Sequence, residues 1–137
     1  MKAAVFNEYG SPDVLHITDV EAPTPKDNEI RVKVHATSVT FGDLMVRKMN
    51  TITPGKFTMP APLWLPTRLM FGFNKPKINI LGAEFAGKVD TIGKDVTRFK
   101  VGDEVFGYLG MWMGANAEYV CLKEDISVTH KPQNMSY

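Results

Sequence analysis

The stretch Gly82–Gly107, GAEFAGKVDTIGKDVTRFKVGDEVFG, decides the fold of this chain. Glycine adopts positive φ without a steric penalty, so Gly93 before Lys-Asp and Gly102 before Asp103 are expected at tight turns. The apolar residues between the glycines suit a pleated sheet and are Phe85, Val89, Val96, Phe99, Val101 and Val105. The stretch therefore predicts two strands and a turn in the wall of a small β-barrel.

Glu84 is a lone carboxylate within this wall, between glycines and beside Phe85. Burying a charge without a partner is costly. We therefore expect Glu84 to have a structural role, holding the local backbone or a neighbouring side chain. The same structural role is assigned to Gly82, Gly87, Gly93, Gly102 and Asp103.

The segments on either side predict more strands. Glu29–Val39 alternates between apolar and polar residues, which is typical of a half-buried strand. Lys2–Phe6, Val14–Thr18 and Ala115–Leu122 are the other expected strands. The chain of 137 residues is one domain, mainly β with short helices, and is large enough to enclose a core.

A short helix is expected from Thr40 onward. The Thr40 hydroxyl can cap its first turn, and Asp43 falls three residues later near the positive end of the helix dipole. Arg47 and Lys48 lie near the other end of that dipole. Helix capping alone therefore accounts for Thr40 and Asp43.

The spacing Gly82-x-Glu84-x-x-Gly87-x-Val89-x-x-x-Gly93-x-x-Val96, followed by Gly102-Asp103-x-Val105, resembles the signature of the medium-chain dehydrogenase/reductases. This superfamily includes the alcohol dehydrogenases and the quinone oxidoreductases. The opening MKAAVF, the strand from Ile30 to Val39 and the segment Gly114–Val120 match as well, so the resemblance covers essentially the whole chain. It implies a GroES-like, partly open β-barrel over 1–137, the N-terminal catalytic domain. The Rossmann domain that holds the cofactor is absent from this chain and is expected beyond Tyr137.

The resemblance also implies the chemistry of the site. The position of the family's catalytic zinc-binding cysteine is Thr40, and that of its histidine is Ala83, and neither side chain binds zinc. Cys121 is the only cysteine, so the structural zinc loop is missing too. A zinc-free, quinone oxidoreductase-like member is expected, with Thr40 and Asp43 orienting substrate or relaying a proton. Thr40 and Met45 are expected to contact the cofactor, although zinc-free quinone reductases usually have asparagine and tyrosine there.

Asn50–Ile80 is the least regular stretch and holds five of the nine prolines. Between Asp43 and Glu84 every charged residue is basic. Long apolar loops inside compact domains are usually functional or mobile. We expect either a loop packed over the barrel mouth or a substrate lid, with a short helix within Leu63–Phe73; docking on a membrane surface is a third alternative. The expected substrate contacts are Phe57, Trp64, Phe71, Tyr108 and Met111.

Composition excludes some functions. The net charge of +1 gives no general attraction to nucleic acid or membranes. No stretch is apolar over the roughly 18 residues of a membrane span. The single cysteine and the lack of an apolar N-terminal segment favour a reducing cytoplasm.

Three functions remain open. The first is the N-terminal domain of an NAD(P)H-dependent oxidoreductase that reduces quinones, enones or related carbonyls. Its NADP would be bound by the missing Rossmann domain, because the chain has no Gly-x-Gly-x-x-Gly phosphate turn. The fragment alone is then expected to be inactive and to be a possible homo-oligomer. The second is a non-catalytic GroES-like binding or scaffold module, and the third is a stand-alone small-molecule binder that uses the Asn50–Ile80 lid.

Overall fold

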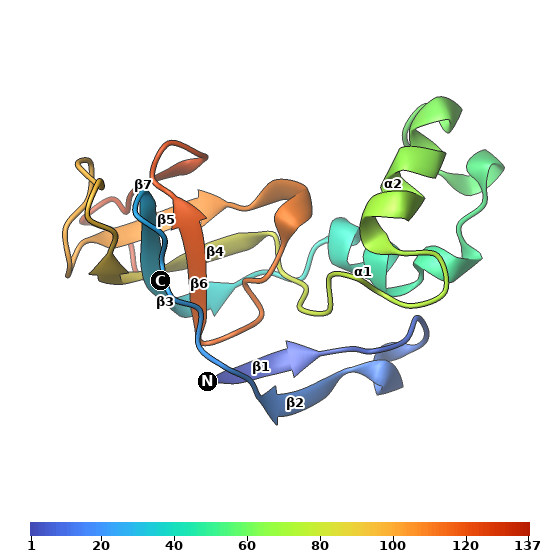
Figure 1. Cartoon of the computed structure of the whole chain (residues 1–137), viewed down its shortest axis with the longest axis horizontal. Helices are drawn as coiled ribbons and strands as arrows, with labels where there is room; N and C mark the ends of the chain where they lie inside the picture. The colour runs from blue at the N-terminus through green and yellow to red at the C-terminus, as the bar shows by residue number, and fades with distance from the viewer.

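The structure, a computed structural model, describes residues 1–137 and is mainly β with two short α-helices (Figure 1). The strands are β1 (Lys2–Val5), β2 (His16–Asp19), β3 (Glu29–Thr37), β4 (Glu84–Ile92), β5 (Glu104–Tyr108), β6 (Tyr119–Lys123) and β7 (Val128–His130). The α-helices are α1 (Phe41–Arg47) and α2 (Trp64–Phe71). Five single 3-10 turns are η1 (Pro12–Val14), η2 (Met49–Thr51), η3 (Pro54–Lys56), η4 (Ala61–Leu63) and η5 (Gly110–Trp112). The predicted fold class is confirmed.

Five strands form one antiparallel sheet in the order β6-β3-β4-β5-β7. The Gly82–Gly107 stretch supplies β4, the turn and most of β5, as predicted. The end strands β6 and β7 do not pair with each other, so the barrel is partly open. Strands β1 and β2 form a separate antiparallel pair, which a bridge between Ala3 and Ala117 connects to the segment before β6.

Two apolar cores stabilise the chain. The larger one fills the inside of the five-stranded sheet, and Ile30, Val32, Val89 and Val105 are its most buried members. The smaller one contains Phe6, Tyr9, Val46, Met49, Phe71, Leu81 and Met113. It joins the segment after β1 to α1, to α2 and to the approach to β4. Figure 1 shows α1, α2 and the turns around them as a lobe at one end of the sheet.

A buried tyrosine fastens α2 to the N-terminal segment. The hydroxyl of Tyr9 donates to the carbonyl oxygens of Phe71 and Gly72, each at 2.7 Å. The guanidinium of Arg68 stacks over the rings of Tyr9 and Phe73. Burial raises the pKa of Tyr9, and the Arg68 charge opposes that rise. The phenol therefore stays protonated and keeps its role as donor at neutral pH.

Three local predictions were wrong in detail. The strand expected over Val14–Thr18 begins only at His16, because Pro12–Val14 forms a 3-10 turn closed by the Leu15 amide on the Pro12 carbonyl. The strand expected over Ala115–Leu122 begins at Tyr119, because the amides of residues 115 and 116 bond to the carbonyls of Gly82 and Leu81 instead.

The third correction concerns the glycine turns. Both glycines lie at turns as predicted, and the turn at Gly93 is closed by the Val96 amide on the Gly93 carbonyl at 3.2 Å. Only Gly102, however, has the expected positive φ, of 97°. Gly93 is required for a different reason: a Cβ there would lie 2.0 Å from the carbonyl oxygen of Lys26. The position is restricted by the close approach of another backbone and not by a left-handed turn.

Candidate functional site

Helix α1 starts where strand β3 ends, and a reciprocal contact between Thr40 and Asp43 fixes this junction. The Thr40 amide donates to Oδ2 of Asp43 at 2.6 Å, and the Thr40 hydroxyl donates to the same oxygen at 3.0 Å. The predicted capping box is therefore present. The other carboxylate oxygen of Asp43 accepts the amide of Gly82 at 2.7 Å, just before β4. Asp43 is 2% exposed and ties the helix to the strand.

A cavity of about 370 Å³ lies beside this junction. Helix α1 with η2 forms one side, the Phe57–Met59 segment and α2 form another, and η5 with its flanking residues closes it. Seventeen residues line it: Thr40, Phe41, Gly42, Met45, Val46, Met49, Phe57, Thr58, Met59, Thr67, Phe71, Ala83, Glu84, Tyr108, Gly110, Met111 and Met113. Its size and its mainly apolar lining are those of a small-molecule site.

Most of the site residues expected from the sequence meet in this cavity. Thr40 and Met45, expected near the cofactor, line it together with Phe57, Phe71, Tyr108 and Met111, expected near the substrate. The Asn50–Ile80 stretch thus contributes a wall of the cavity, through residues before and within α2. These residues come from segments far apart in the chain, so their gathering is a result of the fold.

Two expected site residues lie outside the cavity. Trp64 donates its indole N–H to the Ile52 carbonyl at 2.8 Å and packs edge-on against Phe73. Asp43 uses its carboxylate on backbone amides and the Thr40 hydroxyl. Neither residue is placed to touch a ligand in the cavity. A substrate contact for Trp64 and a direct catalytic role for Asp43 are therefore not supported by their positions.

Several lining residues were not anticipated from the sequence, and three of them are methionines. Met49, Met59 and Met113 join Met45 and Met111 around the cavity. The high methionine count was a visible signal, but only the folded chain brings these side chains together.

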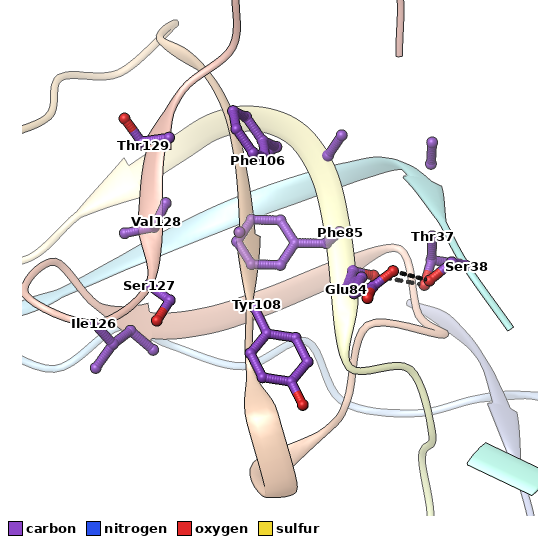
Figure 2. Close-up of a pocket in the computed structure, with 13 residues that line it drawn as sticks. Thr37, Ser38, Glu84, Phe85, Phe106, Tyr108, Ile126, Ser127, Val128 and Thr129 are labelled. Atoms are coloured by element: carbon purple, nitrogen blue, oxygen red, sulfur yellow. Dashed lines mark hydrogen bonds between the residues drawn. The ribbon is translucent and has the colours of Figure 1, made fainter. Parts of the chain in front are cut away.

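Glu84 and Tyr108 lie opposite each other on β4 and β5 and separate this cavity from a wider groove. The groove measures about 780 Å³ and follows the sheet face from residues 36–38 to 126–129. Figure 2 shows Phe106, Tyr108 and Ile126 along it, and the hydrogen bonds that Thr37 and Ser38 make with Glu84. The Ser38 hydroxyl donates to the Glu84 carboxylate at 2.5 Å. Glu84 thus holds a neighbouring side chain, as expected.

The smaller cavity is the stronger candidate for chemistry. The groove contains only Tyr108 and Glu84 among the expected site residues, and it lies against one sheet face. The smaller cavity is enclosed by helix, loop and strand, and the half-buried hydroxyl of Thr40 is one of the few polar groups in its lining.

The donor set beside Thr40 does not suit a metal. Ala83 contributes a methyl group to the cavity, and Glu84 is the only carboxylate in the lining. A catalytic zinc requires about three ligands of cysteine, histidine or carboxylate type. Across the whole chain no three such side chains gather at one point.

The strand arrangement does not suit a dinucleotide either. Every strand pair in the structure is antiparallel. A dinucleotide site of the Rossmann type needs parallel strands and a glycine-rich turn that leads into a helix N-terminus. This chain on its own offers a cavity for a small ligand and no cradle for a pyrophosphate.

Cys121, the one free thiol, lies away from the cavity on β6. Burial, with the nearby charge of Glu29, raises its pKa to about 11, against a smaller opposing effect of Arg31. A thiol with that pKa is protonated at neutral pH, so it is a poor nucleophile. None of the helices has the length and apolar character needed to cross a membrane.

Comparison with known proteins gives consistent matches. Residues 26–133 match the alcohol dehydrogenase GroES-like domain. The quinone oxidoreductase of Pseudomonas aeruginosa is 32% identical over 136 residues, which cover 99% of this chain and 35% of that protein. The mitochondrial NAD(P)H oxidoreductase RTN4IP1 of Dictyostelium discoideum is 29% identical, over 100% of this chain and 35% of that protein.

A solved structure gives the same result. The quinone oxidoreductase from Coxiella burnetii superimposes with a TM-score of 0.77 at 30% identity, covering 99% of this chain and 38% of that one. The chain thus spans little more than a third of the length of the relatives it matches.

Proposed function

Because this chain belongs to the alcohol dehydrogenase GroES-like domain family, we propose that it is the substrate-side domain of a zinc-free, NAD(P)H-dependent oxidoreductase. The proposed substrates are quinones, enones or related carbonyl compounds. Two relatives, described as a quinone oxidoreductase and an NAD(P)H oxidoreductase, support the reaction class. The resemblance to the quinone oxidoreductase-like branch of the medium-chain dehydrogenase/reductases is confirmed by these matches.

One observation carries the proposal: the 370 Å³ cavity gathers apolar side chains around the hydroxyl of Thr40. Phe57 and Phe71 are buried in its wall, and Tyr108 and Met111 are exposed at its edge. Such a lining binds a flat apolar molecule and excludes water from it. Excluding water strengthens any polar contact that the ligand then makes.

Thr40 is the proposed polar contact, and Asp43 is the residue that positions it. The Thr40 hydroxyl donates its proton to Asp43, so only the lone pairs of the hydroxyl oxygen are available to a ligand. This oxygen can therefore accept a hydrogen bond only from an N–H or O–H group. Among the proposed reactants the carboxamide of the nicotinamide carries such a group, whereas a quinone or enone does not, so the proposed partner of Thr40 is the cofactor of the complete protein. Asp43 acts through Thr40 and Gly82 and does not touch the ligand.

The nicotinamide cofactor must be held elsewhere, because the antiparallel sheet does not fit a dinucleotide. We propose that a Rossmann domain outside this chain supplies it, with NADP as the proposed cofactor. The 137 residues then bind and orient the substrate but do not reduce it on their own. The zinc-free character rests on Thr40 and Ala83, and elemental analysis that found about one zinc per chain would contradict it.

The test is NADPH-dependent reduction of 1,4-naphthoquinone by the chain extended to the length of its relatives, compared with the chain alone. We expect turnover only in the extended protein. In that protein, Thr40→Val should lower kcat/KM for NADPH by about tenfold, the equivalent of the one hydrogen bond from the nicotinamide carboxamide. Thr58→Val is the matched control, because Thr58 lines the same cavity but its hydroxyl bonds to the sulfur of Met45. An extended protein without activity, or equal effects of the two variants, would contradict the proposal.

A second candidate function is a stand-alone small-molecule binder. It is favoured by one observation, that a mainly apolar cavity of about 370 Å³ is present in the 137-residue chain by itself. Ligand binding by the 137-residue chain, together with no turnover by the extended protein, would support this alternative over the oxidoreductase.

A further inference from the structure

Five of the eight methionines of the chain line the 370 Å³ cavity. They are Met45, Met49, Met59, Met111 and Met113, and the remaining three, Met1, Met70 and Met135, lie elsewhere. The five come from α1, η2, the loop before η4, η5 and the residue after η5. Separate segments therefore present the same kind of side chain to one space.

Methionine is unbranched, has three rotatable side-chain bonds and carries a polarizable sulfur. It adapts to ligands of different shape and makes favourable contacts with aromatic rings. The five side chains differ in how firmly they are held. Met49 and Met113 are 1% and 7% exposed and belong to the smaller core, whereas Met59 and Met111 are 40% and 41% exposed. Packing therefore holds the two buried methionines in place, whereas the two exposed methionines are free to change conformation.

The charge of the lining restricts the ligand further. Glu84 carries the only formal charge among the lining residues, and no lysine, arginine or histidine is present. The basic residues of the neighbouring lobe, including Arg47 and Arg68, lie outside the cavity. An anion would find no cation there to offset the loss of its hydration when it enters the apolar lining.

We propose that this cavity selects uncharged, bulky aromatic ketones of more than one shape, and that the exposed methionines Met59 and Met111 set this breadth. The inference names the substrate class of the proposed oxidoreductase and rests on that function. Small anionic substrates are disfavoured because the lining offers no cation.

The experiment uses the 137-residue chain with [methyl-¹³C]methionine and follows its methionine methyl signals by NMR. Flat 1-tetralone, twisted benzophenone and anionic 1-naphthoate are the three probes. Both ketones should shift the signals of the five lining methionines and leave Met1, Met70 and Met135 in place, each ketone in its own pattern. The naphthoate should shift none of them. Single Met→Leu variants assign the signals.

Breadth is tested with Met59→Leu and Met111→Leu, which keep similar volume but remove the sulfur and some flexibility. Together they should weaken benzophenone binding by about fivefold relative to 1-tetralone, which corresponds to one sulfur–aromatic contact. Met70→Leu is the control and should change neither affinity. Ketones that leave the five signals unchanged, naphthoate binding as tight as ketone binding, or equal loss of both ketones in the double variant would overturn the inference.

Binding in this experiment requires neither cofactor nor turnover. Methyl shifts in the chain alone, with no activity in the extended protein, would support the proposed ligand class and contradict the proposed oxidoreductase function. Activity on naphthoquinone without the predicted methyl shifts would support the oxidoreductase function and contradict the proposed ligand class.

Discussion

At the residue scale, the organisation of the site depends on Asp43. Its carboxylate accepts two hydrogen bonds from Thr40 and one from the Gly82 amide, and it is almost fully buried. A single side chain thereby couples the end of β3, the start of α1 and the entry to β4. The position of the Thr40 hydroxyl in the cavity is a consequence of this contact.

Replacing Asp43 by alanine should destabilise the fold. The amides of Thr40 and Gly82 would lose their partner, and unpaired buried donors cost about 1–3 kcal/mol each. We expect the free energy of unfolding to fall by roughly 2–4 kcal/mol in a urea titration followed by circular dichroism. Asp125→Ala, on an exposed turn, should change it by less than about 0.5 kcal/mol. Equal stability of the two variants would contradict this role of Asp43.

The pKa of Cys121 allows a second test at this scale. Because burial raises its pKa to about 11, the thiolate fraction near pH 8 should be about 100-fold below that of a thiol at the ordinary value of 9.0. Alkylation by iodoacetamide should therefore be slow and should rise through pH 10 without levelling off. A rate that reached a plateau below about pH 9 would show that the thiol is not shielded.

The sequence allowed prediction of the pairing with Thr40, which supplies two of the three hydrogen bonds of Asp43. The pairing of Thr40 with Asp43 is a three-residue pattern, and its physics is local. The bond from Gly82 spans 39 residues and depends on how β4 returns beside α1. No local pattern contains that information. The place of Trp64 could not be predicted either. An aromatic residue in an apolar loop can line a pocket or donate to a backbone carbonyl such as that of Ile52, and only the fold distinguishes the two.

At the element scale, the sheet and the lobe differ in how their backbones are held. Strand β3 pairs with β4 on one side and β6 on the other. The backbone bonds within residues 50–63 run between residues three apart in 3-10 turns, as from Lys56 to Thr53 and from Leu63 to Pro60. The lobe is held in place mainly by its side chains, among them Phe57 and Phe71.

This difference predicts the pattern of amide hydrogen exchange. Residues 50–63 should exchange fastest among the internal segments and be cut first by proteases, because local turns open without disrupting the sheet. Amides in Ile30–Val34 should be the slowest. A lobe as well protected as β3, measured by exchange and mass spectrometry, would be inconsistent with this account.

Strand periodicity was the most reliable guide at this scale. The alternation in Glu29–Val39 predicted β3, which ends two residues earlier, at Thr37. Predictions were less accurate where backbone polar groups found partners outside a ladder. Residues 115 and 116 bond to Gly82 and Leu81, and the contact of Gly93 with Lys26 depends on tertiary packing.

At the scale of the whole molecule, the chain has a cavity for a small ligand but no dinucleotide-binding arrangement of strands. The walls that surround a ligand are present, from α1 to η5. Parallel strands and a phosphate-binding turn are not. The relatives extend over nearly three times this length.

The central claim is that this chain supplies the substrate side of the site and does not hold the dinucleotide. A fluorescence titration of the 137-residue chain with NADPH tests it most directly. We expect no saturable signal up to about 1 mM, because nothing in the antiparallel sheet cradles a pyrophosphate. A dissociation constant in the micromolar range would contradict the account.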